Sequence, residues 1–90
     1  MATLTCIPST RAMNAMCKLL SDYKAKADNR ATLAEIRQEL GNADYIAFRD
    51  DMVRLMRKMP AAKAVAEIIG AAMRRKRELL AANRSQRNAQ

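Results

Sequence analysis

Residues 32–59, TLAEIRQELGNADYIAFRDDMVRLMRKM, are the stretch of this sequence that decides its fold. Thr32 and Glu35 form a capping box, in which each side chain satisfies a free backbone amide at the start of a helix. The apolar residues that follow share one helical face: Leu33, Ile36 and Leu40. Gly41 would end this helix, because glycine readily adopts the left-handed conformation that terminates many helices.

A second helix is predicted to follow almost at once. We expect Asn42 or Asp44 to cap it, because their side chains accept hydrogen bonds from the first free amides of a helix. Its apolar residues recur every three or four positions, which is typical of an amphipathic helix packed on a core. They are Tyr45, Phe48, Met52, Leu55 and Met59, flanked by Ile46, Val53 and Met56. Pro60 would stop this helix or kink it.

The sequence predicts one further helix on each side of this stretch. Ser9 or Thr10 can cap a helix that runs to about Lys26. Its apolar stripe is Met13, Met16, Cys17, Leu20, Tyr23 and Ala27. The other helix covers residues 61–82, and Gly70 weakens its middle by about 1 kcal/mol relative to alanine. We expect this glycine to allow another helix to approach closely. The stripe of this helix is Val65, Ile68, Ile69, Ala72 and Met73, resumed by Leu79 and Leu80.

We therefore predict an all-α fold, a small bundle of about four helices in one domain. Two glycines and two prolines in 90 residues agree with a helical composition. Residues 1–8 read as an extended arm that ends in Pro8, because the residue before a proline disfavours helix. Residues 9–82 would form the single helical domain, and residues 83–90 a flexible basic tail.

The core of such a domain must be thin. Half of the residues are apolar, but only Phe48, Tyr23 and Tyr45 are aromatic. A core of this kind needs very regular helix packing or a partner subunit, so we expect a homodimer formed through the Met- and Leu-rich stripes. Cys17 falls on an apolar stripe and is predicted to be a small core residue. Cys6 could be a free thiol.

The net positive charge lies entirely in the C-terminal part. Residues 1–53 carry seven basic and seven acidic side chains, whereas residues 54–90 carry ten basic residues against Glu67 and Glu78. These 37 residues therefore carry the whole net charge of +8. A neutral body with a cationic end indicates a polyanionic partner: nucleic acid, an acidic protein surface or a membrane face.

Residues 32–59 also resemble the helix-turn-helix core of bacterial regulators and of winged-helix domains. The resemblance rests on Leu33-Ala34-Glu35-Ile36 as the first helix, Leu40-Gly41 at the turn, and the amphipathic helix that follows. In that family the second helix lies in the major groove of DNA. The resemblance implies that this helix would face DNA through Asn42, Ala43, Asp44, Ala47, Arg49, Asp50 and Asp51. Of these, Asn42 and Arg49 have side chains suited to contact base edges.

The basic cluster is the second candidate site. Four consecutive residues, 74–77, cover about 300° around a helix axis and would form a cationic collar. Six residues are the candidates for phosphate contacts: Arg74, Arg75, Lys76, Arg77, Arg84 and Arg87. Arg54, Arg57 and Lys58 would extend the patch. Arginine predominates, and its guanidinium group suits phosphate. Because a stacking platform for single strands needs aromatic side chains, we expect duplex DNA or structured RNA. A solvated helix end, whose charges favour the helix C-terminus, is the simpler interpretation.

A different class of function uses the same helix. An aliphatic stripe beside an arginine cluster can bind an acidic, apolar groove on another protein, as an adaptor or inhibitor does. The positions that such a partner would contact are Ile68, Met73 and Leu80. Methionines on or beside the stripes would fill the core or form an adaptable binding face. The basic helix lacks Trp or Phe anchors, so we do not expect membrane binding.

The sequence contains no signal of an enzyme. It has no histidine, no phosphate-binding glycine loop and no metal-ligand spacing, and its carboxylates lie on faces predicted to be exposed. We expect no catalytic residue, no metal and no cofactor. With no signal peptide and no long apolar segment, the protein is expected to be cytoplasmic. Its size and charge would suit a regulator or accessory factor of a phage or plasmid.

Overall fold

The computed structural model describes the backbone of residues 7–88 and the side chains of residues 7–82. Within this range the chain forms four helices and no strand. They are α1 (Thr10–Ala25), α2 (Arg30–Leu40), α3 (Asn42–Met56) and α4 (Ala61–Asn88). The predicted all-α fold of four helices is confirmed. Residues 1–6 of the predicted arm, Cys6 among them, lie outside the described residues.

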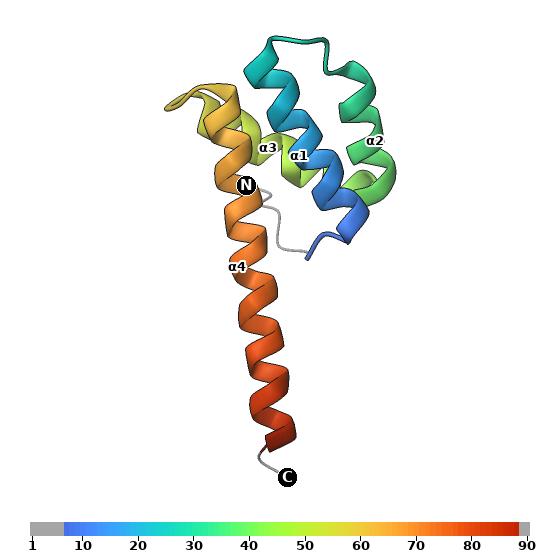
Figure 1. The fold of residues 1–90 in the computed structure, drawn as a ribbon. Coiled ribbons are helices and arrows are strands. Elements are labelled where there is room, and N and C mark those ends of the chain that lie inside the picture. The colour runs from blue at the N-terminus through green and yellow to red at the C-terminus, as the bar shows by residue number, and fades with distance from the viewer. Residues whose placement is uncertain (1–6, 89–90) are drawn as a thin grey trace.

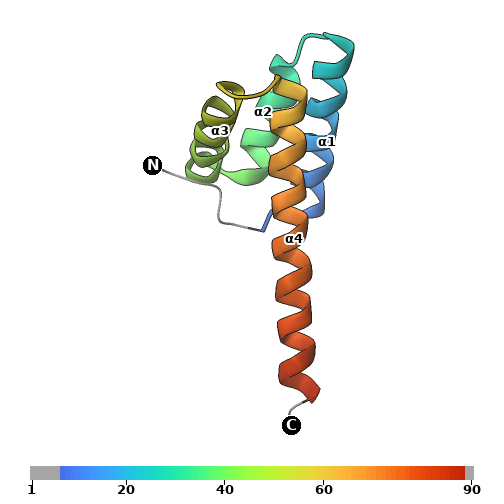
Figure 2. The same cartoon turned by 90° about the vertical axis from the view of Figure 1, so that its left-hand side faces the viewer.

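The helices form a ring with one long member. Each helix packs against its neighbours in sequence, and α4 returns to pack against α1. Figures 1 and 2 show that α1, α2, α3 and the first half of α4 make the body, while the second half of α4 projects from it. The molecule is therefore elongated, with extents of 50 × 26 × 25 Å.

The core lies inside the ring, and each helix contributes to it. The largest fully buried side chains are Phe48, Met16, Leu19, Ile36 and Val65. Buried alanines complete the interface, because their small side chains let the helices approach closely: Ala12, Ala15, Ala47, Ala64 and Ala72. Phe48 is the one fully buried aromatic ring among the described residues, and Tyr23 and Tyr45 pack against the core as partly buried side chains.

The prediction that Cys17 is a core residue was wrong, because its side chain is exposed. The buried side of α1 passes through Ala15, Met16 and Leu19. Each residue turns the helix by about 100°, so Cys17 points away from the direction in which Met16 is buried. The two alanines one turn apart, Ala12 and Ala15, take the place in the core that the stripe assigned to larger side chains.

The start of α1 was predicted correctly, and the start of α2 was not. Ser9 caps α1 and accepts a hydrogen bond from the Ala12 amide at 3.1 Å. Helix α2 begins at Arg30, two residues before Thr32. The Asp28 carboxylate accepts a hydrogen bond from the Arg30 backbone amide at 3.0 Å. The Thr32 hydroxyl instead donates to Asp22 Oδ2 of α1 at 2.6 Å. This bond to a neighbouring helix replaces the predicted capping box.

Gly41 alone separates α2 from α3. Its φ of 87° confirms the predicted positive angle, but its ψ of 162° is extended rather than left-handed helical. Gly41 is also the N-cap residue of α3, so the prediction that Asn42 or Asp44 caps this helix was wrong. A residue with this φ and ψ reverses the chain so sharply that no further loop residue is needed, and only glycine adopts it readily.

Helix α4 differs from its prediction at two points. It continues six residues past residue 82, to Asn88. Its first half is held by packing, so nucleation is complete, and a segment rich in Ala, Arg and Leu can propagate the helix. Gly70 does not admit a close helix, since a Cβ built there would meet nothing within 4 Å.

Candidate nucleic-acid interface

The basic cluster lies where α4 leaves the body. Beyond Ala72 no side chain of α4 is buried in the part of the helix whose side chains are described. Arg74, Lys76 and Arg77 are exposed, and Arg75 is half-buried. The predicted collar of charge is therefore accessible from several sides. Arg84 and Arg87 belong to the projecting part of α4 by their backbone positions, and their side chains lie outside the described residues.

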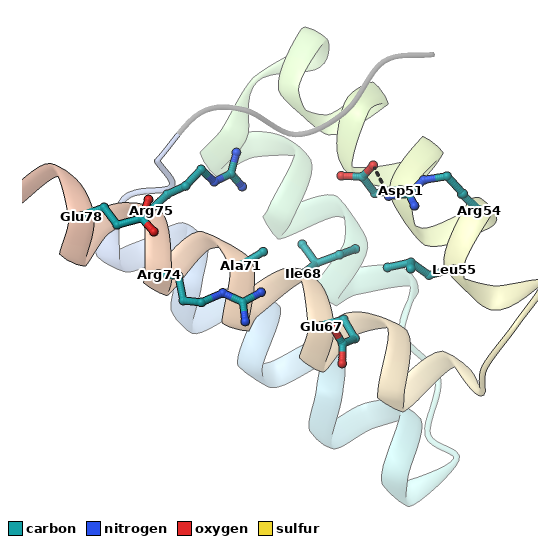
Figure 3. Close-up of a pocket in the computed structure, with 9 residues that line it drawn as sticks. All are labelled: Asp51, Arg54, Leu55, Glu67, Ile68, Ala71, Arg74, Arg75 and Glu78. Carbon is teal, nitrogen blue, oxygen red and sulfur yellow. Dashed lines mark hydrogen bonds and ion pairs between the residues drawn. The ribbon is translucent and has the colours of Figure 1, made fainter.

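A cleft between α3 and α4 brings basic and acidic residues together. It has a volume of about 450 Å³ and is lined by Asp51, Arg54 and Leu55 of α3 and by residues of α4 from Glu67 to Glu78 (Figure 3). Asp51 is buried and forms an ion pair with Arg54 at 3.2 Å. The charge of Arg54 is thus partly balanced, and its predicted role in phosphate contact is weakened.

No pattern in the sequence indicates the acidic side of this cleft. Asp51 was expected to face outward on α3, but it is only 7% exposed. Glu67 precedes the basic cluster by about two helical turns and Glu78 directly follows it, and both share the cleft with Arg74 and Arg75. These carboxylates make the α3 side of the collar less cationic than the opposite side of α4.

Arg57 and Lys58 do not join the collar. They are exposed in the turn after α3, at the end of the body where α4 begins. From residue 61 to residue 74 the helix rises by about 20 Å, so the two groups lie far apart along α4. They form a separate pair of basic side chains and do not extend the collar.

Asn42 and Arg49 lie on the outer face of α3. Both are exposed, and the Asn42 side-chain oxygen accepts a hydrogen bond from Arg37 Nε at 3.0 Å. Ala47 and Asp51, expected on the same face, are buried. The outer face instead carries the exposed side chains of Ile46 and Val53. The connection between α2 and α3 is also shorter than the usual turn of about three to four residues in helix-turn-helix proteins.

The three positions proposed for a protein partner do not behave alike. Ile68 is buried at 5% exposure, so it cannot contact a partner as predicted. It faces the core because α4 packs on both α1 and α3 over this turn. Met73 and Leu80 are both 51% exposed. Most of the predicted stripe methionines pack on the core, and Met56 and Met73 do not.

Tyr23 and Asp28, near the connection between α1 and α2, have shifted pKa values. Burial raises the pKa of Tyr23, and the neighbouring Tyr45 raises it further, while a hydrogen bond with Asn29 acts in the opposite direction. The Arg30 guanidinium and amide hold the pKa of the exposed Asp28 carboxyl below its ordinary value. Among residues 7–82, no three His, Cys, Asp or Glu side chains lie together as metal ligands would.

The fold and the site define a small all-α protein with a basic, projecting helix. Comparisons with protein families, curated proteins and solved structures found no significant match. No helix in the described part of the chain is long and apolar enough to cross a membrane. The function must therefore be inferred from the side chains themselves.

Proposed function

We propose that this protein is a small, non-enzymatic nucleic-acid-binding protein, a regulator or accessory factor of the cytoplasm that contacts phosphates through α4. The observation that carries the proposal is the position of the charge: the whole net charge belongs to the last 37 residues, and its densest part lies on a helix that projects from the body.

A projecting helix suits a groove better than a flat surface does. The major groove of duplex DNA admits an α-helix, and phosphates line it on both sides. A helix with arginines around most of its circumference can contact both phosphate backbones at once. Lys76 and Arg77 lie on the side of α4 away from the α3 cleft. The pocket that these two residues line contains no acidic residue.

The outer face of α3 supplies a second, weaker element of the proposal. If the helix-turn-helix resemblance holds, Asn42 and Arg49 would read base edges while α4 holds the backbone. A homodimer would present two such helices to one duplex. Base reading by α3 and dimer formation both belong to the proposal of nucleic-acid binding. Phosphate binding by α4 requires neither of them.

The test compares two triple variants that remove equal charge. The first is Arg74→Gln, Lys76→Gln and Arg77→Gln in the collar. The matched control is Lys24→Gln, Lys26→Gln and Lys63→Gln, three exposed lysines at the opposite end of the body. Affinity for a random duplex of about 30 base pairs is measured by fluorescence anisotropy at several salt concentrations.

Loss of three phosphate contacts should make the log–log salt slope shallower by about 2.7, whereas the control should keep the wild-type slope. An equal effect of both variants would mean that total charge, not the collar, determines binding, and would contradict the proposed site. An unchanged salt slope in both variants would contradict it as well.

A further inference from the structure

A groove lies between the start of α1 and the middle of α4, on the side of α4 away from the α3 cleft. Its volume is about 410 Å³. Pro8, Met13 and Cys17 line one side, and Ile69, Met73 and Leu80 line the other. Three of these residues are partly or largely open to solvent: Cys17, Met73 and Leu80. The side chains of residues 7–82 leave this groove open.

The groove has the length of a short helix. Ile69 and Leu80 are 11 residues apart on α4, which is about 16 Å or three helical turns. Helix α4 projects beyond α1 (Figure 2), and Leu80, the groove residue farthest along α4, is 51% exposed. An apolar channel of this length is the kind of surface that accepts the apolar face of an amphipathic helix.

The charged residues around the groove indicate which kind of molecule it binds. Lys76 and Arg77 stand at the groove, and none of its lining residues is acidic. The cleft on the other side of α4 differs, because Asp51, Glu67 and Glu78 line it. An occupant therefore needs apolar side chains to contact the apolar lining and carboxylates to pair with Lys76 and Arg77.

A second copy of this chain does not meet this requirement. Its exposed apolar stripe on α3, which includes Ile46 and Val53, is bordered by two arginines, Arg49 and Arg57, against one carboxylate, Asp50, so its border is net positive. Its stripe on α4 is bordered by the same basic cluster, so either face would bring like charges together. Nucleic acid supplies the negative charge but no aliphatic side chains for Met13, Met73 and Leu80.

We infer that this groove binds an acidic amphipathic helix of a protein partner. Its apolar residues, spaced by three and four positions, would contact Met13, Met73 and Leu80, and its carboxylates would lie at Lys76 and Arg77. This inference does not rest on the proposed nucleic-acid function. Where both hold, the partner helix competes with phosphates for Lys76 and Arg77, and its binding releases the nucleic acid.

The test uses a fluorescent designed peptide of about 18 residues, long enough to form a helix, with one leucine stripe and glutamates on the other faces. Two control peptides have the same leucines with lysine in place of glutamate, and the same composition in scrambled order. Binding to the full chain is measured by anisotropy without nucleic acid. The acidic amphipathic peptide should bind at least about tenfold more tightly than either control.

Two protein variants locate the site. Met73→Gln should weaken binding of the acidic peptide by about tenfold. Met56→Gln is the matched control, because Met56 is 47% exposed but lies on α3, away from the groove. Neither side chain is in the core, so circular dichroism should show both variants folded. Equal peptide affinity in the two variants, or equal binding of the lysine peptide, would overturn the inference.

Other occupants give different results. If a second copy fills the groove, sedimentation should show a wild-type dimer that Met73→Gln converts to a monomer, and this would also overturn the inference. If the groove belongs to the nucleic-acid surface, Met73→Gln should reduce duplex affinity and leave the peptide without a site. Peptide binding and duplex binding are measured separately, so failure of one is distinguishable from failure of the other.

Discussion

The two glycines of this protein should respond to alanine in opposite ways. Gly41 joins α2 to α3 with a φ of 87° and a ψ of 162°. Gly70 lies inside α4 with an ordinary helical backbone. A Cβ added at either position meets nothing within 4 Å, so packing cannot explain any difference between them. The backbone alone determines the outcome.

The magnitudes follow from the two conformations. Alanine at position 41 would be forced into a region of φ and ψ that is almost restricted to glycine, which costs about 1–3 kcal/mol. Alanine at position 70 should stabilise the helix by about 0.5–1 kcal/mol, because the unfolded chain loses freedom and no contact is disturbed. For a domain of this size, 1 kcal/mol shifts Tm by about 4–8 °C. Gly41→Ala should therefore lower Tm, and Gly70→Ala should raise it.

Thermal and urea unfolding followed by circular dichroism at 222 nm would measure both variants, since helix dominates the signal. A neutral Gly41→Ala variant would show that the α2–α3 connection does not require a glycine conformation. A destabilised Gly70→Ala variant would show that another helix approaches α4 at this point. Either result would refute the backbone explanation.

Three further predictions concern the body. Phe48→Ala should lower the free energy of unfolding by about 3–5 kcal/mol, because it removes the only aromatic ring that is fully buried, and urea unfolding would show it. Thr32→Val should cost about 1–3 kcal/mol by removing the hydroxyl that donates to Asp22, whereas Thr32→Ser should retain most of the stability. The raised pKa of Tyr23 means that the unfolded chain ionises first, so the stability it contributes is complete below about pH 10 and is lost as the pH rises further. Unfolding of Tyr23→Phe between about pH 8 and 11 should show a smaller alkaline loss than the wild type.

Local patterns predicted most of the fold. Gly41 marks the end of α2 and Pro60 directly precedes α4, although α3 ends at Met56 rather than at Pro60 as predicted, and the stripes around Met16, Phe48 and Val65 face the core. These features depend on residues close in sequence, such as a glycine that can take a positive φ or an apolar repeat of three and four. Such signals need no knowledge of which helix packs where.

Contacts between helices set the limits of the prediction. Thr32 and Glu35 have the sequence pattern of a capping box, yet Thr32 bonds to Asp22 and Glu35 pairs with Lys18, both on α1. The apolar repeat of α1 is wide enough to include Cys17, and only the direction in which α2 and α4 pack excludes it. For Thr32, Glu35 and Cys17, the position of the neighbouring helix determines the contacts, and the pattern along the chain does not.

The candidate site was likewise predictable only in part. The concentration of charge in residues 74–77 is a property of the sequence, and the structure adds that this segment projects from the body. The carboxylates of Asp51 and Glu67 across the α3 cleft, and the apolar groove at Met73, depend on the faces of α4 that α3 and α1 cover. The sequence predicted that Met73 and Leu80 could contact a partner, but no spacing along the chain indicates the acidic side of the cleft or the residues of α1 that complete the groove.

The central claim is that α4 is a phosphate-binding surface, and a salt titration of the wild-type protein tests it most directly. Anisotropy would follow binding to a random duplex of about 30 base pairs from about 50 to 300 mM salt. Six phosphate contacts predict micromolar or tighter binding at the lowest salt and a log–log slope of about −5. Absence of binding at about 50 mM salt, or a slope near zero, would contradict the claim.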